Sequence, residues 1–347
     1  MKKVIFISAL AIAAAVSCTK SDIVDTKFNE EIGFETYLGR DAQTKGSIVE
    51  RKDLKAVTVY GYYTGTTDWS TEAGIAPNLW TNGLELKLTE TGVEELDEAN
   101  KRYWANATDQ YTFLAYGPID NENLASPTDK TDPTLTYTVD KDFQKHVDVL
   151  RATPIINTTK EDVAGSVQLA FKHTLSRVNV KATLNADKPF EYHIKSITLS
   201  GKFNTKGTLS LADSKGWLVD EADYMNEIYT FYKNDSEPTA ATATPLAATT
   251  TDYSKVVPDG AKYDNYMMMI PTIFDATNKA TLEVVYYTYA GGVKSRDYSV
   301  KHEITTPFVA GSAYTFVLGF VQNTAEITFD VEVDEWTEET PVEIAAN

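Results

Sequence analysis

The single cysteine of this 347-residue chain, Cys18, lies one residue, Ser17, beyond the apolar run of residues 4–16. Two lysines precede the run, and its length is typical of an export signal but too short to cross a bilayer comfortably. Residues 15–18 are similar to a bacterial lipobox, with Ala15 where leucine is usual. We therefore expect residues 1–17 to be a signal peptide and Cys18 to carry lipid, palmitate included, that enters the outer membrane. The alternative is signal cleavage nearby that leaves Cys18 as a stray thiol.

Histidine and carboxylate positions do not predict an active site. The histidines form neither an H-E-x-x-H motif nor a close pair suited to zinc; they are His146, His173, His193 and His302. The sequence has no G-x-S-x-G elbow, no phosphate-binding loop and no dinucleotide-binding fingerprint. Paired carboxylates are frequent, but they arise by chance in a chain with 50 acidic residues. We expect structural histidines, no metal, no cofactor and no enzymatic activity.

Aromatic residues are the remaining candidates for ligand binding. The chain has five tryptophans and twenty tyrosines, and flat rings can stack on sugars. Trp69 and Trp80 lie in predicted loop regions that contain Gly and Asn, where a ligand could reach them. A lipid-anchored, glycan-binding β-sandwich protein is therefore an alternative function. The competing interpretation is that these rings fill sandwich cores and edges.

The formal net charge of −18 excludes some classes of partner. It becomes about −20 if the signal is removed together with its two lysines. Because this charge repels phosphate backbones and anionic lipid head groups, we expect no nucleic acid partner. The acidic residues are spread along the chain, which is typical of a solvated exterior. A chain with one cysteine has no internal disulfide, so strand pairing and packing must stabilise the fold.

The elements that would position functional residues are predominantly strands. The alternating apolar residues of the segment 32–37 predict a first strand. A polar segment with Arg40 and Lys45 follows, and exposed loops of this kind are where proteases cut. Residues 92–102 predict the one persuasive short helix, because an acidic start and a basic end suit the helix dipole.

The clearest alternation lies near the end of the chain, in residues 326–334. One face of this segment is apolar and the other carries only acids and Thr; the apolar residues are Ile327, Phe329, Val331 and Val333. Burying them would contribute on the order of 6 to 12 kcal/mol before the entropy cost of ordering. Such a strand can pair within its own domain or extend the sheet of a neighbouring molecule.

The length and composition of the chain predict two domains. About 330 residues remain after the signal, enough for two sandwich-sized cores. Residues 18–29 are polar and suit a lipid-linked tether. A polar stretch near 157–165 marks the expected boundary. We expect an all-β protein with an N-terminal β-sandwich over 30–160 and a C-terminal β-sandwich over 161–347.

Several segments, in this order along the chain, resemble the fimbrillin family, the lipoprotein-derived subunits of type V pili that include the Mfa-like proteins. Residues 102–118 are similar to the family's W…Y-x-F-x-A-Y-x-P segment, and residues 148–153 to its D-x-L-x-A-T segment. Residues 167–178 are similar to its F-x-H-x-L-S-x-V signature, and residues 311–336 to its closing G-x-x-Y-x-F…I-x-F…W pattern.

The resemblance implies two transthyretin-like β-sandwich domains in tandem, export as a lipoprotein to the cell surface, and assembly with other fimbrillin subunits into a fimbrium that serves cell adhesion. It also implies that a trypsin-like processing protease, arginine-specific in the family, removes the first strand. The C-terminal strand of the next subunit then fills the groove. On this chain the released strand would be residues 32–37, and the donor strand would present Ile327, Phe329, Val331 and Val333.

The processing position departs from the family pattern. Where the family often has Thr-Arg-Ala, this chain has Thr44-Lys45-Gly46, and the nearest arginines are Arg40 and Arg51. The candidates for cleavage are therefore Arg40, Lys45 and Arg51. Without a cut, the resemblance implies a lipid-anchored basal or non-polymerising member instead of a shaft subunit.

Overall fold

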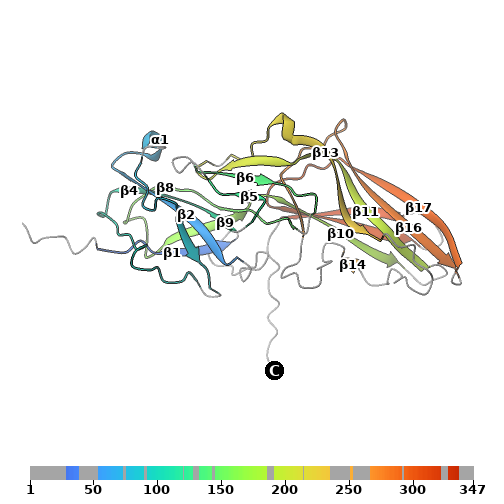
Figure 1. The fold of residues 1–347 in the computed structure, drawn as a ribbon, viewed down its shortest axis with the longest axis horizontal. Helices are drawn as coiled ribbons and strands as arrows, with labels where there is room; N and C mark the ends of the chain where they lie inside the picture. Colours follow the sequence, from blue (N-terminus) through green and yellow to red (C-terminus); the bar gives the residue numbers. More distant parts are fainter. Residues whose placement is uncertain are drawn as a thin grey trace, which may run out of the picture.

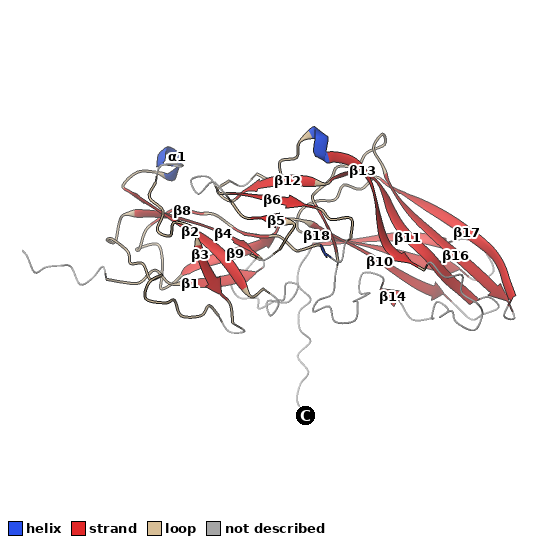
Figure 2. Ribbon diagram, in the orientation of Figure 1, coloured by secondary structure: helices blue, strands red, loops and turns tan. Residues whose placement is uncertain are grey.

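In the computed structural model, the regular elements of the described residues are nearly all β-strands (Figures 1 and 2). The structure describes residues 29–38, 54–72, 76–89, 92–119, 121–127, 133–142, 145–185, 191–213, 215–234, 251–252, 266–290, 293–321 and 327–335. The all-β expectation is confirmed. Within these ranges, no helix is long and apolar enough to cross a membrane.

The N-terminal half is built on a seven-stranded sheet. Six strands follow one another in the order β1-β9-β7-β4-β2-β3, and the seventh, β8, pairs with β4. Its strands are β1 (Phe34–Leu38), β2 (Ala56–Gly65), β3 (Leu84–Lys87), β4 (Gln110–Gly117), β7 (Leu150–Ala152), β8 (Ile155–Thr158) and β9 (Val167–His173). Consecutive strand residues point to opposite faces. Since β4 is buried from Tyr111 to Gly117, both faces of the sheet are covered at this strand, whereas β3 and β9 each keep one face partly exposed.

The C-terminal half contains two further sheets. A five-stranded sheet has the order β14-β10-β18-β19, with β15 paired to β10, and a four-stranded sheet has the order β13-β11-β16-β17. The strands are β10 (Ser176–Asn185), β11 (Glu191–Asn204), β13 (Tyr224–Lys233), β14 (Thr251–Asp252), β15 (Met267–Met269), β16 (Ala280–Ala290), β17 (Val293–Ile304), β18 (Ser312–Val321) and β19 (Ile327–Glu335). Side chains of both sheets meet in one buried cluster that includes Val180, Leu199 and Leu282.

A small three-stranded sheet, β12-β6-β5, connects the two halves. Strands β5 (Leu124–Ala125) and β6 (Thr134–Thr138) come from the first half and β12 (Lys206–Ser210) from the second. The Arg151 guanidinium reinforces this connection by donating to the carbonyl oxygens of Ser210 and Asp213, each at 2.9 Å. Because one buried cluster extends from Tyr60 to Phe320, the two halves share a continuous core.

The helix predicted over residues 92–102 is wrong. This segment folds back on β3, since the Glu94 N–H donates to the Lys87 carbonyl oxygen (2.9 Å) and Val93 bridges to Leu88. Most of its side chains are exposed, and only Val93 and Leu96 pack against the N-terminal core, which is too narrow an apolar stripe to hold a helix there. The helical elements that lie wholly within the described ranges are the short α1 (Trp69–Glu72) and a 3-10 turn, η3 (Glu221–Asp223).

The boundary predicted at 160/161 assigns β9 to the C-terminal domain, and this assignment is corrected. Strand β9 pairs with β1 and β7 in the first sheet, so the chain passes between the halves at Thr174 and Leu175. The polar stretch near 157–165 is instead a connection within the N-terminal half. Main-chain hydrogen bonds carry no sequence signal, so alternation predicts a strand but not its partner.

His146 has the structural role predicted for the histidines. Its Nδ1 accepts a hydrogen bond from the Met268 N–H (2.9 Å), and its Nε2 lies 2.7 Å from the Asp140 carbonyl oxygen. These contacts require a neutral ring with the proton on Nε2. Burial lowers the pKa of His146 to about 4.

The free energy of unfolding should therefore depend on pH through His146. His146 takes up its proton near pH 6.5 in the unfolded chain and near pH 4 in the folded protein. The contribution of the neutral His146 to the free energy of unfolding is therefore fully present above pH 6.5 and is lost as the pH falls through the folded pKa. The loss should reach about 3 kcal/mol. Urea unfolding of the wild type and His146→Gln from neutral to acid pH measures it. The variant should be less stable at neutral pH and lose less on acidification; parallel losses would contradict the prediction.

Candidate assembly site

The first strand docks at an edge of the N-terminal sheet through two sets of main-chain bonds. Strand β1 runs parallel to β9 over five residue pairs, and the two lie side by side in Figure 1. Just before β1, the Ile32 N–H donates to the Arg102 carbonyl oxygen (2.8 Å). The Trp104 N–H donates to the Glu30 carbonyl oxygen (3.1 Å). The segment 30–38 therefore binds both the 102–104 segment and β9.

Two apolar side chains on one face of this segment fill the site beneath it. Ile32 is 0% exposed and Phe34 is 8% exposed. The centroid of the Phe34 ring lies 5.9 Å from that of Trp80 and 5.6 Å from that of Phe113, edge-on to the latter. Burial of Ile32 and Phe34 contributes on the order of 3 to 6 kcal/mol before ordering entropy is subtracted. An edge strand thus completes the N-terminal core.

Trp80 is a fixed wall of this first-strand site. Its Nε1–H donates to the Asn100 carbonyl oxygen (2.8 Å), and the Arg102 guanidinium lies 6.0 Å from the ring centroid. Gly61 of β2 provides the space for the ring, because a Cβ there would come within 2.6 Å of a Trp80 ring carbon. The indole therefore cannot move toward β2, and it holds one side of the Phe34 pocket.

Two lysines lie at the rim where the segment enters the site. Lys160 Nζ is 2.8 Å from Glu30 Oε2, and Lys101 Nζ is 3.8 Å from Glu31 Oε2. A hydrogen bond from Lys101 to Glu98 raises the pKa of Lys101 and keeps it cationic. Exposed ion pairs of this kind contribute little to affinity. The two lysines therefore favour an acidic residue just before the strand, but they add little to the affinity of the site for it.

This arrangement can bind an extended segment. Without β1, the site would present the unpaired main-chain groups of β9, the aromatic pocket of Trp80 and Phe113, and a cationic rim. Strand addition uses these features: main-chain hydrogen bonds supply affinity, and alternate side chains fill pockets.

The terminal strand pairs within its own chain. β19 is antiparallel to β18 over nine residue pairs and is an edge of the five-stranded sheet, so it belongs to a different sheet from β1. Val331 is half-buried against the core, but Val333 is 50% exposed. The sheet of its own chain thus leaves part of the predicted apolar face of β19 in solvent.

The other candidate residues from the sequence either lie outside the described part of the chain or are buried. Four lie outside the described part of the chain: Cys18, Arg40, Lys45 and Arg51. Trp69 and Trp80 are 6% and 5% exposed, and Trp69 packs against Tyr62 with ring centroids 4.7 Å apart. The expectation that a ligand could reach these two rings is corrected, since both are core side chains.

Three further aromatic residues of the first-strand site, Trp104, Tyr111 and Phe113, could not be singled out individually from the sequence. Tyr111 and Phe113 alternate along β4 and point to one face, and Trp104 lies 4.9 Å from the Tyr111 ring. All three belong to the 102–118 segment by which the chain resembles the fimbrillins. Their alternation was visible in the sequence, but their contact with the first strand was not.

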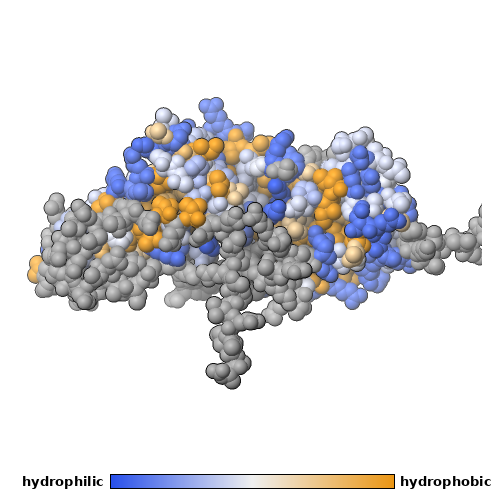
Figure 3. All heavy atoms as spheres, turned by 180° about the vertical axis from the view of Figure 1, so that it is seen from behind, coloured by the Kyte–Doolittle hydropathy of each residue, from blue (hydrophilic) through white to orange (hydrophobic). Residues whose placement is uncertain are grey.

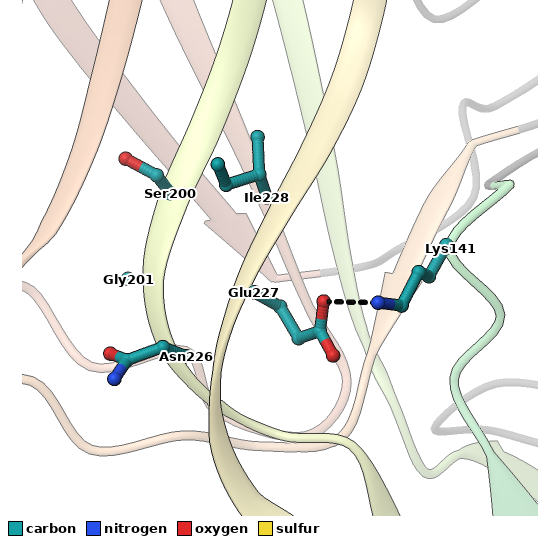
Figure 4. A pocket seen from close by; sticks show the side chains of 6 residues that line it. All are labelled: Lys141, Ser200, Gly201, Asn226, Glu227 and Ile228. Carbon is teal, nitrogen blue, oxygen red and sulfur yellow. Dashed lines mark ion pairs between the residues drawn. The ribbon is translucent and has the colours of Figure 1, made fainter.

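A surface hollow of about 540 Å³ lies on the four-stranded sheet (Figure 4). It is lined by Lys141, Ser200, Gly201, Asn226, Glu227 and Ile228, and Lys141 Nζ lies 3.2 Å from Glu227 Oε2. These lining residues include no aromatic ring that could stack on a sugar.

The face shown in Figure 3 mixes hydrophobic and hydrophilic residues, as ordinary solvated surfaces do. In the described ranges, no group of three His, Cys, Asp or Glu side chains could hold a metal.

The fold places the chain among elongated all-β proteins, and comparison with known proteins defines the family. The family model described as fimbrillin-like matches residues 47–336, so the chain belongs to that family. The fimbrium subunit Fim1C of Phocaeicola vulgatus is 22% identical over 397 aligned residues, with 99% of this chain and 98% of that protein covered. A crystal structure of a fimbrial protein from Bacteroides vulgatus has a TM-score of 0.66 at 19% identity, with 89% of this chain and 100% of that chain covered. The resemblance to the fimbrillins is confirmed.

Phe34→Ala should loosen the first strand. Truncating a buried aromatic ring costs about 3 to 5 kcal/mol, and here the loss falls on the docking of β1. Glu35→Ala on the exposed side of the same strand is the matched control, with an expected change within about 0.5 kcal/mol. Urea unfolding and the rate of limited trypsin digestion measure the effect. Indistinguishable behaviour of the two variants would show that the aromatic pocket does not hold the strand.

Proposed function

We propose that the protein is a structural subunit of a fimbrium, exported as a lipoprotein and assembled by donor-strand exchange, and that it serves cell adhesion. The observation that carries this proposal is the first-strand site, where an edge strand near the start of the fold buries Ile32 and Phe34. Membership of the fimbrillin-like family supports the fimbrial role. The two halves would be transthyretin-like sandwiches in tandem.

Lipid on Cys18 would hold the exported chain at the outer membrane. Cys18 precedes β1, and the cleavage candidates Arg40, Lys45 and Arg51 follow it. A cut at any of the three therefore separates the fold from its lipid and removes the covalent link between β1 and the rest of the sheet. One proteolytic event would both release the subunit and allow its first-strand site to open.

The donor strand would be β19 of a second fimbrillin subunit. Its half-exposed Val333 shows that the apolar face is not fully used in the monomer, so transfer to a deeper site can gain burial. Exchange also requires the nine pairs between β18 and β19 to separate. Because donor and acceptor lie on different sheets, the contact is head-to-tail, and such a contact grows a filament if it does not close into a ring.

The glycan-binding alternative has no comparable support. Its two candidate platforms, Trp69 and Trp80, are buried. Trp80 has a structural use in the wall of the first-strand site.

The N-terminus of the mature subunit tests the processing step. Intact mass and N-terminal sequencing of the surface protein should give a lipid-free start just after Arg40, Lys45 or Arg51. A variant with all three changed to Gln should remain acylated on Cys18 and should not polymerise, whereas Lys87→Gln, on the exposed side of β3, should behave as wild type. Normal filaments from the triple variant would exclude this cleavage as the trigger.

Removal of the donor should stop filament growth. A chain lacking residues 326–347 should remain monomeric, because it has an acceptor site but no strand to donate. A shorter deletion of residues 336–347 keeps β19 and is the control, which should still polymerise. Electron microscopy and size-exclusion chromatography after processing distinguish the two. Filaments of ordinary length from the longer deletion would refute donor-strand exchange through β19.

A further inference from the structure

The first strand and the terminal strand share a sequence pattern. Residues 31–36 are Glu-Ile-Gly-Phe-Glu-Thr, and residues 326–331 are Glu-Ile-Thr-Phe-Asp-Val. Aligned without a gap, the Ile and Phe coincide, an acid follows the Phe, and a β-branched residue comes next. The two side chains that fill the first-strand site, Ile32 and Phe34, thus have counterparts at the same spacing in β19.

We propose that β19 enters the first-strand site of a second copy of this chain in one register, with Phe329 in the place of Phe34 and Ile327 in the place of Ile32. This inference rests on the proposed function. It adds to that function the partner, a second copy of the chain, together with the register and direction of the donor strand.

The aromatic pocket selects the register. Phe329 is the only aromatic residue of β19, and the place of Phe34 lies against the rings of Trp80 and Phe113. A shift by two residues would put Ile327 or Val331 there and leave part of the pocket empty. One such shift would also force a phenyl ring into the enclosed place of Ile32, and overpacking destabilises.

The exposed side of the strand agrees with this register. Gln168 Nε2 of β9 lies 3.2 Å from Glu35 Oε2, and Asp330 takes the position of Glu35. The Asp330 carboxylate would therefore lie opposite the same Gln168 amide as the Glu35 carboxylate, on a side chain that is one methylene shorter. Val331 takes the place of the half-buried Thr36, where a β-branched side chain already lies against the sheet.

One position differs, and the site can adapt to it. Thr328 would replace Gly33, where an added Cβ lies 3.1 Å from Ser166 Oγ. The Ser166 side chain is only half-buried, so it can move by the few tenths of an ångström required. At this position, the site therefore accommodates Gly33 of its own first strand somewhat better than Thr328 of the donor strand.

The same alignment fixes the direction of the donor. β1 is parallel to β9, so a donor in this register is parallel as well. A reversed strand with Phe329 kept in the aromatic pocket would put Asp330 at the place of Gly33, against Ser166, and Thr328 opposite Gln168. It would lose the carboxylate beside Gln168 and crowd Ser166 with a charged side chain.

Disulfide trapping tests the register in the full chain. Cys18→Ser removes the one native thiol, Gln168→Cys labels β9, and the second cysteine is placed at Asp330, Thr328 or Glu332 in three separate proteins. Each protein is treated with trypsin to release β1, left to assemble and then oxidised. Non-reducing electrophoresis should show cross-linked ladders with Asp330→Cys about tenfold stronger than with the other two, and no ladder before trypsin.

The other outcomes separate the two levels of the proposal. Ladders mainly from Thr328→Cys would indicate a shifted or reversed strand, and ladders mainly from Glu332→Cys a shift in the other direction; either overturns the register. Filaments without any cross-link to Gln168→Cys would overturn it too, because the donor would then not lie beside β9. If the wild type and all three variants stay monomeric after trypsin, donor-strand exchange itself fails, and this inference fails with it.

A second variant pair tests the aromatic pocket directly. Phe329→Ala should slow polymerisation about tenfold or more, whereas Glu332→Gln, on the acidic face of the same strand, should have a small effect. Thermal unfolding of the uncleaved monomers checks that both variants fold. Equal polymerisation rates for two folded variants would overturn the role of Phe329.

Discussion

The burial of Ile32 and Phe34 beneath an edge strand is the interaction on which the N-terminal half depends. Edge strands are ordinarily the least secured part of a sheet, since one row of their main-chain groups lacks a neighbour. Here the edge strand also covers the aromatic cluster of Trp80 and Phe113. Removing β1 therefore opens the sheet and the core at once. Exposed main-chain groups and an exposed apolar pocket then favour capture of another strand over a stable empty site.

The topology connects this site to the terminal strand by a short route. β9, which holds β1, continues after a two-residue connection into β10; β10 pairs with β18 over nine residues, and β18 pairs with β19 over nine. At the connection, the buried His173 ring lies 2.8 Å from Asp148, and Thr174 donates to the Val149 carbonyl oxygen. In a filament built by exchange, tension would pass from the donor strand through β9, β10 and β18 to the next donor. A joint with buried hydrogen bonds suits that load.

The strands at both ends of the chain were predictable because alternation is a local signal. The segment 32–37 and β19 each show a face of apolar residues that needs no knowledge of the fold. Partner choice was not predictable: β9 was separated from the sheet in which it pairs, because hydrogen-bonded edges are chemically alike. The accessibility of Trp80 was misjudged for a related reason. Its loop position is local, but its burial depends on Gly61 and Phe34, which only the folded chain brings to it.

The proposed exchange needs a covalent trigger, and the geometry explains why. While residues 39–55 connect β1 to β2, the first strand competes for its site intramolecularly, at an effective concentration on the order of millimolar for a short connection. A donor strand from another subunit competes only at its own, lower concentration, and it must first leave β18. The donor strand also fits the site no better than β1 does, because its Thr328 would take the place of Gly33. Cleavage changes this balance, since a released β1 dissociates into bulk solvent while the donor remains attached to a subunit that other contacts can hold nearby. An uncut chain would therefore keep its site closed and could end a filament without extending it.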